Sequence, residues 1–509
     1  MKSKPRILMP SVLTSTRRHD PRHPMRHHAR HRGRAMKAAL LIALAALSGC
    51  AAVGPDHHAP TPDVPSQWSG PSPHGGDLRQ LGAWWQRFND PILIRLQQAA
   101  ESDSPSLAVA WANVEISRAT LRNAGASALP SVSAAGSVTR ARQQGTPTRT
   151  TSAGSFDASW ELDLFGKVRR SVESAQAQIE ARRGDWHDAR VTLAAEVASN
   201  YVEYRACSLL VDVYEQELVS IDQTTQATES LVRAGMSPNT DAALAQATQA
   251  STTSALLGQR TECELLVKSL SNLTGLQDAE LRSLLASGAA SVNTALPTAP
   301  TFAVDRVPAD VLRQRPDVAT RERELAAASA KVGVAVADLY PSLQLGGSVG
   351  VSAVGGSSSG LWSFGPSISV PLFDGGTRRA AVDSARASHE AAYAQWRDAV
   401  RTAVTDVEKA LVRLADANLR VVQSGRAAQA YRRYLAGAQA ERQAGTVSLL
   451  TFEEARRQSL SAQLDLIGLQ RDQVTDWIAL YKALGGGWDR ASSTDITPPR
   501  SRISEQASK

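Results

Sequence analysis

The sequence is poor in cysteine, with three in 509 residues, and aromatic residues make up only 5% of it. So few cysteines exclude a disulfide-dense scaffold. Apolar residues make up 42%, which excludes wholesale disorder. The apolar run at 38–47 has about ten residues, whereas a helix needs about 20 to cross a bilayer.

Acidic residues are nearly absent from the N-terminal stretch, which therefore accounts for the formal net charge of +7. Residues 1–35 hold ten Lys/Arg and one acid, Asp20, and Lys37 brings the local sum to +10. The chain from Cys50 onward therefore carries −3. A basic chain usually suggests a nucleic-acid partner, but this distribution removes that argument, and we expect none.

A basic stretch, a short apolar core and small residues predict a signal peptide over 1–49. Its end, Leu47-Ser48-Gly49-Cys50, resembles the bacterial lipobox. That resemblance implies N-acyl and diacylglycerol lipid on Cys50, with no other cofactor, and Ala51 fits transfer to the outer membrane. An ordinary signal peptide with a chance cysteine is the alternative, and Met25 or Met36 could be the true start.

An internal repeat organises the remaining chain. Three pairs of matching residues lie 211 positions apart: Pro105 and Pro316, Pro130 and Pro341, and Leu273 and Leu484. A period this long indicates a duplicated domain and not a solenoid. The predicted parts are a lipidated segment with an equatorial helix at 50–100, repeats at 101–276 and 312–487, a linker at 277–311 and a tail at 488–509.

Each repeat contains two strand-like runs in which apolar and polar residues alternate. They predict strands within about 131–164 and about 342–372, with polar loops at 142–152 and 354–360. Runs of about ten residues with one apolar face are typical of transmembrane β-strands. A soluble antiparallel sheet packed on a core is the alternative.

Two very long helices follow the strands, at about 167–234 and 375–443, and neither contains proline. Their apolar residues recur every 3.5 positions, which indicates left-handed coiling about neighbouring helices. At 1.5 Å per residue each forms a rod of about 100 Å. Gly235 and Gly445 occupy predicted helix C′ positions, after which a second helix runs back to about 274 or 484.

The sequence offers no enzymatic constellation, because it lacks a phosphate-binding glycine loop, a Cys/His metal spacing and a nucleophile elbow. We therefore expect neither catalysis nor a metal site. We expect no catalytic or metal-binding role for the histidines. His57 and His58 are predicted to lie in a solvated segment, and His187 and His389 on helix surfaces. The run Arg313 to Arg315 fits a turn and subunit-packing element better than a phosphate site.

Several motifs occur in a characteristic order. They are the lipobox, Val53-Gly54-Pro55-Asp56, Trp84-Trp85 with Asp90-Pro91, Leu312-Arg313-Gln314-Arg315-Pro316-Asp317-Val318 and the two repeats. Together they resemble the outer membrane factor family, which is TolC- and OprM-like, in its NodT lipoprotein branch. The resemblance implies an α+β membrane protein that forms a homotrimer. Three copies would close a 12-stranded β-barrel in the outer membrane, continued by a periplasmic α-helical barrel.

The resemblance also implies a periplasmic gate after the second tip. Leu450 falls on the family's hydrophobic constriction, and Glu454 stands where an aspartate is usual. The two lie four residues apart, hence on one helix face. Asp241 matches the acidic residue after the first tip. Coiled-coil core for Leu450 and a solvated charge for Glu454 are the alternatives.

Two cysteines lie at equal distances from the first tip. Cys207 is 28 residues before Gly235, and Cys263 is 28 after it, so an antiparallel hairpin places them level with one another. The periplasm is oxidising, which favours a disulfide. Two buried thiols are the alternative.

The predicted function is a passive outer-membrane channel of a tripartite efflux pump for small molecules, in contact with outer-membrane lipid. The family implies a periplasmic adaptor that contacts the tips at Gly235 and Gly445, and an inner-membrane pump of the RND type. A type I protein-secretion channel and a non-conducting scaffold lipoprotein are the alternatives.

Overall fold

The computed structural model describes residues 52–71, 78–142, 144–145, 147–291, 295–304 and 308–488. The predicted signal peptide, the Cys50 lipidation site and the tail beyond Trp488 lie outside these residues. The described residues from 52 to 488 belong to one compact unit. Among the described helices, none combines the length and the apolar character needed to cross a membrane.

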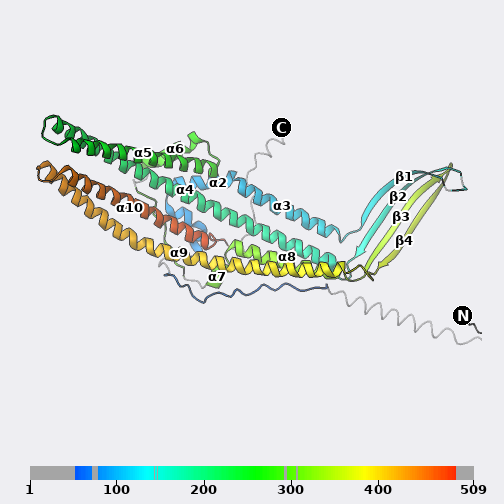
Figure 1. The fold of residues 1–509 in the computed structure, drawn as a ribbon. Helices are drawn as coiled ribbons and strands as arrows, with labels where there is room; N and C mark the ends of the chain where they lie inside the picture. Colours follow the sequence, from blue (N-terminus) through cyan, green and yellow to red (C-terminus); the bar gives the residue numbers. More distant parts are fainter. Residues whose placement is uncertain are drawn as a thin grey trace, which may run out of the picture. The chain divides into compact units, whose positions relative to one another are not determined.

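Both repeats have the same order of elements (Figure 1). The first contains α3 (Pro105–Ala126), β1 (Ser131–Ala141), β2 (Arg149–Leu162), α4 (Lys167–Arg233) and α5 (Asn239–Thr274). The second contains α8 (Pro316–Ala337), β3 (Ser342–Val354), β4 (Ser357–Ser369), α9 (Thr377–Gln443) and α10 (Leu449–Ala483). Outside the repeats lie η1 (Leu78–Phe88), α2 (Pro91–Asp103), α6 (Asp278–Ser291) and α7 (Pro308–Leu312).

Two boundaries differ from the sequence predictions. The segment expected to be a linker, 277–311, contains helices α6 and the start of α7, and Leu281 and Leu285 of α6 are buried. The strands also extend into the expected loops, since β2 already begins at Arg149 and β4 at Ser357. Hydroxyl-rich ends of a strand lack the apolar alternation on which the prediction depended.

The four strands form one antiparallel sheet in the order β1-β2-β3-β4. The register places apolar side chains in cross-strand rows, such as Ala134, Phe156, Val349 and Trp362. The opposite face is rich in serine and glycine. The apolar face is uncovered: Phe156 is 62% exposed and Trp362 83%.

Helices α4 and α9 each have 67 residues and begin after a left-handed glycine, Gly166 or Gly376. Glycine has no side chain that could cap the helix, so an aspartate upstream accepts hydrogen bonds from N–H groups at the helix start. Asp163 accepts the Val168 and Arg169 N–H groups, and Asp374 accepts those of Gly376 and Arg378.

The C-terminal ends of α4 and α9 are also equivalent, and the predicted C′ glycines are confirmed. Gly235 has φ +71° and Gly445 has φ +75°. The Gly235 N–H donates to Val232 and the Met236 N–H to Leu231. This is a Schellman motif, and the second tip repeats it.

Each long helix packs on the helix that follows it, α4 on α5 and α9 on α10, and also on sequence-distant helices: α4 contacts α8 and α10, and α9 contacts α8. The largest core lies where η1 and α2 meet α4 and α10. Trp84 is fully buried there, stacks on Tyr481 at 4.8 Å between ring centroids, and donates from Nε1 to the Pro300 carbonyl at 2.8 Å.

Arg315 of the Arg-Pro-Asp motif is buried and packs within its own chain. Its Nη1 donates to the Ala483 carbonyl at 2.9 Å, and its guanidinium pairs with Asp317 and Asp406. It therefore joins the start of α8 to α9 and to the end of α10. Arg313 is exposed.

Two histidine predictions are wrong. His187 is 9% exposed and lies 4.9 Å from Trp186 and 5.6 Å from Trp488 between ring centroids, because neighbours cover α4 on several sides. The His57 side chain is only 13% exposed, with Nε2 3.6 Å from Glu322 Oε1, and burial lowers its pKa. His58 is exposed and His389 is half-buried.

Candidate functional site

The two hairpins pack against each other near their tips. Leu449, Phe452 and Ala455 of α10 form a small core with Ala245 of α5 and Ala438 of α9. Helix α10 begins at Leu449, where the Ser448 Oγ accepts the Thr451 N–H at 3.1 Å. The start of α10 is thus fixed by a cap and by this core.

Leu450 lies outside that core. It is 65% exposed, while its neighbour Leu449 is 1% exposed. Within this chain Leu450 therefore does not belong to the packed core, whereas Leu449 does. Leu450 is therefore an exposed apolar side chain at the tip. Exposed apolar side chains can line a constriction or an interface.

Glu454 follows one helical turn after Leu450 and is ionised. Its Oε1 is 2.7 Å from Arg457 Nη2 and 2.8 Å from Gln458 Nε2. Hydrogen bonds from Arg457 and from Gln458 lower the pKa of Glu454. The carboxylate is held on the face that it shares with Leu450.

Asp241 lies in the first turn of α5, where a negative charge interacts favourably with the helix dipole. Its carboxylate accepts the Ser237 hydroxyl at 2.6 Å. This bond fixes the turn that follows Gly235.

A buried charge cluster, which sequence reasoning missed, joins α10 to α4. Arg456 is 3% exposed, and its Nη1 lies 3.0 Å from Glu453 Oε1. Its Nη2 donates to Ser220 Oγ at 3.1 Å and to Thr224 Oγ1 at 2.9 Å. Its Nε lies 3.3 Å from Glu217 Oε1. We refer to Arg456, Glu217 and Glu453 as the Arg456 cluster.

Burial and charge oppose each other in the Arg456 cluster. Burial raises the pKa of both Glu217 and Glu453, and the Arg456 guanidinium opposes that shift. The Arg456 guanidinium also lies 4.5 Å from the centre of the Phe452 ring. The sequence signal for this cluster is a charge at an inward heptad position, since Leu449, Phe452, Arg456 and Ser459 follow each other by three, four and three.

Cys207 and Cys263 are joined by a disulfide that links α4 to α5, with their Cα atoms 5.6 Å apart. The equal spacing from Gly235 therefore placed them correctly. Polar contacts continue the link along the hairpin: Arg260 pairs with Glu215 at 2.6 Å, and Gln249 donates to Asp222 at 3.0 Å.

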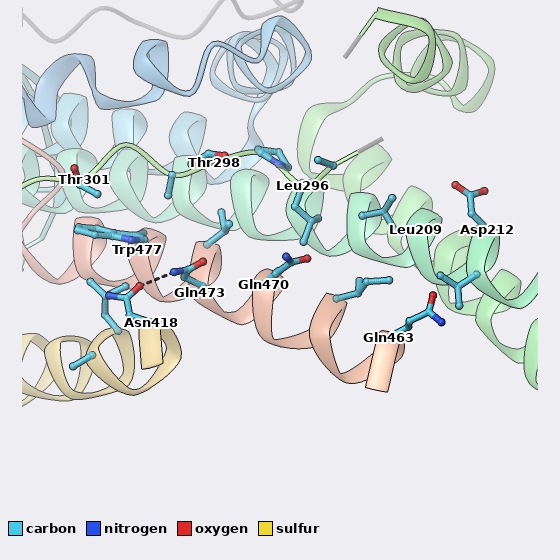
Figure 2. A pocket seen from close by; sticks show the side chains of 18 of the residues that line it. Leu209, Asp212, Leu296, Thr298, Thr301, Asn418, Gln463, Gln470, Gln473 and Trp477 are labelled. Carbon is cyan, nitrogen blue, oxygen red and sulfur yellow. Dashed lines mark hydrogen bonds between the residues drawn. The ribbon is translucent and has the colours of Figure 1, made fainter. Parts of the chain in front are cut away.

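A pocket of about 1140 Å³ lies between α4, residues 295–301, α9 and α10 (Figure 2). Leu209 and Asp212 of α4 line one side, and amide side chains of α10 line the other. The Gln473 Nε2 donates to Asn418 Oδ1 of α9 at 2.6 Å. The lining is mostly apolar and amide, which suits no acid–base chemistry.

Two aspartates of this region have perturbed pKa values, and burial raises the pKa of Asp212, which lines the pocket. Burial raises the pKa of Asp476 in α10 to about 6, Arg413 opposes the shift, and Asp472 and Asp416 add to it. Within the described ranges, His, Cys, Asp and Glu form no group that could hold a metal ion.

A family model described as outer membrane efflux protein matches residues 96–276 and 307–486, which are the two repeats. The chain belongs to this family. Outer membrane efflux proteins are channels of the outer membrane and not enzymes, and they assemble as oligomers with efflux pump partners.

Relatives match over nearly their whole length. Nodulation protein T of Rhizobium leguminosarum bv. trifolii is 31% identical over 476 residues, covering 88% of this chain and 97% of that protein. The solvent efflux pump outer membrane protein SrpC of Pseudomonas putida is 30% identical, covering 89% and 98%.

Solved structures agree with this efflux protein's fold. The outer-membrane channel OprN has a TM-score of 0.74 at 30% identity and covers 86% of this chain and 99% of that one. The open state of the Neisseria gonorrhoeae MtrE channel has a TM-score of 0.74 at 25% identity, covering 86% and 99%. The predicted duplicated α+β fold is confirmed.

Proposed function

We propose that three copies of this outer membrane efflux protein close into a channel that carries small toxic molecules out of the periplasm. The four strands would contribute to a 12-stranded barrel, and the hairpins would continue it as an α-helical barrel. The observation that carries this proposal is the sheet itself. Its edges, β1 and β4, are open, and its apolar face is exposed. Closure around an axis removes both open edges, which lipid does not tolerate.

The gate in this proposal is the start of α10. Leu450 from each copy would form an apolar ring, with Glu454 and Asp241 supplying acidic rings beside it. The exposure of Leu450 and the ionised state of Glu454 support it. Acidic rings favour cations over anions in a pore.

The proposed partners are a periplasmic adaptor at the tips around Gly235 and Gly445, and an inner-membrane pump of the RND type. The proposed anchor is a lipid on Cys50. Support for the partners comes from relatives whose names describe solvent and antibiotic efflux pumps. A matched pair of tips with one backbone geometry gives the adaptor a repeated contact.

Purified protein in a planar bilayer tests the channel. Discrete conductance steps are expected, and a protein that inserts without conducting would favour the scaffold alternative. Deletion of the gene distinguishes small-molecule efflux from type I protein secretion. Sensitivity to a panel of drugs and organic solvents supports small-molecule efflux, whereas loss of a secreted protein alone would support type I secretion.

A further inference from the structure

The apolar face of the sheet ends abruptly toward the β1–β2 loop. Cross-strand rows run from Leu162, Leu343 and Ile368 to Val138 and Ser152. Ten residues of β2 separate these limits, or about 34 Å along the strand. At a tilt of about 45° this is a band of about 24 Å, close to the apolar band of outer-membrane strands.

Arginines follow directly beyond this band. Arg140 is two residues after Val138 in β1, so it lies on the apolar face. Arg142 directly follows the end of β1, two positions after Arg140. Arg149 pairs with Ala141 and therefore lies on the serine-rich face. All three are exposed.

The surroundings of these arginines carry no negative charge. Residues 130–156 contain Arg140, Arg142 and Arg149 and no Asp or Glu, and residues 341–373 contain no charged residue at all. Among the described residues, none of the three arginines has an ion-pair partner. The end of the sheet farthest from the helices is thus purely cationic (Figure 1).

We propose that Arg140 and Arg142 bind the phosphate groups of anionic lipid in the outer leaflet of the membrane. The inference rests on the proposed barrel, with its apolar face toward lipid and the β1–β2 loop outside. A guanidinium one row past the apolar band reaches the headgroup level, while its aliphatic stem stays against the band. Its planar fork matches phosphate oxygens in a bidentate way.

Arg149 provides the matched control, because it lies at the same end of the sheet but on the other face. The double variant Arg140→Ser/Arg142→Ser and the single variant Arg149→Ser alter exposed side chains, so both should fold. The full-length protein is placed in phosphatidylcholine nanodiscs containing either lipid A with two phosphates or its dephosphorylated form. Co-purified lipid A is then counted by native mass spectrometry.

Wild type and Arg149→Ser should retain phosphorylated lipid A, and the double variant should retain about tenfold less, because each arginine near an anionic surface contributes substantially to attraction. Equal retention of the dephosphorylated lipid, or equal loss in Arg149→Ser, would overturn the proposal. Added inorganic phosphate should not compete; full competition would indicate a free-phosphate site instead.

Conductance in planar bilayers of the same lipids separates this inference from the proposed channel. A conducting wild type whose lipid retention does not depend on Arg140 and Arg142 refutes the lipid site alone. A wild type that neither inserts nor conducts refutes the barrel on which the inference depends.

Discussion

The Nε of Arg456 lies 3.3 Å from Glu217 Oε1, and this ion pair joins the second helical hairpin to the first. The arginine side chain is 4% exposed and the glutamate side chain 15%. Buried pairs of this kind stabilise little relative to an apolar pair, but they are costly to break on one side only.

Arg456→Met should therefore destabilise the protein by about 3–5 kcal/mol, because it leaves Glu217 and Glu453 buried without their cation. Thermal unfolding followed by circular dichroism measures the loss. Arg457→Met is the control: this side chain is 74% exposed, and removing its pair with Glu454 should cost less than about 1 kcal/mol. Restoring neutrality with Glu217→Gln and Glu453→Gln should recover part of the midpoint, and no recovery would argue against this electrostatic origin.

The disulfide gives a second prediction. Removing the Cys207–Cys263 link, which closes a loop across 56 positions, should lower stability by about 2–4 kcal/mol. Protein isolated from the periplasmic side should show no reactive thiol from these cysteines in denaturant until reductant is added. Two free thiols before reduction would show that the bond does not form in the cell.

The gate gives a third prediction. Leu450→Ala should raise conductance and antibiotic leakage, because it widens the proposed apolar ring without touching the Leu449 core. Leu419→Ala in α9 removes the same atoms from a side chain that is 71% exposed and far from the tip in sequence. It should leave single-channel conductance unchanged. Equal conductance in both variants would count against Leu450 as a constriction.

Asp476 gives a pH-dependent prediction. Its pKa in the folded protein, about 6, is above the ordinary value, so the folded state binds the proton more tightly than the unfolded state. The contribution of Asp476 to stability therefore falls as pH rises from about 4 to about 6. Asp476→Asn should raise the melting temperature at pH 7.5 and change it little at pH 4. Asp465→Asn, at an exposed position of the same helix, should have no such pH-dependent effect.

Much of the fold could be predicted from the sequence because its signals are periodic. Alternation located all four strands, and proline-free stretches ending in Gly235 and Gly445 located the long helices. Strand ends were misjudged where serine and threonine replace apolar residues. His187 was misjudged because a helix covered by neighbours on several sides has no single buried stripe.

The candidate site was harder to predict. Family resemblance indicated Leu450, but the sequence does not tell which of two adjacent leucines is exposed. The packing in the structure shows that Leu449 is buried and Leu450 is exposed. The heptad pattern does not predict the role of Arg456, because that pattern is defined by apolar residues and Arg456 places a charge at an inward position. Its partners Glu217 and Ser220 belong to a helix more than 200 residues away, so local pattern could not supply them.

The two-residue turn between β3 and β4 has a consequence for how the sheet reaches its final pairing. Serine and glycine are frequent in both strands, so a slip by two positions would still pair Ser342 with Ser367 and Ser352 with Ser357. Gly355 and Gly356 have φ of +59° and +90°, which suits a tight turn that few other residues accept. The turn therefore fixes the register of β3 and β4, because the side chains of the two strands alone distinguish poorly between alternative registers.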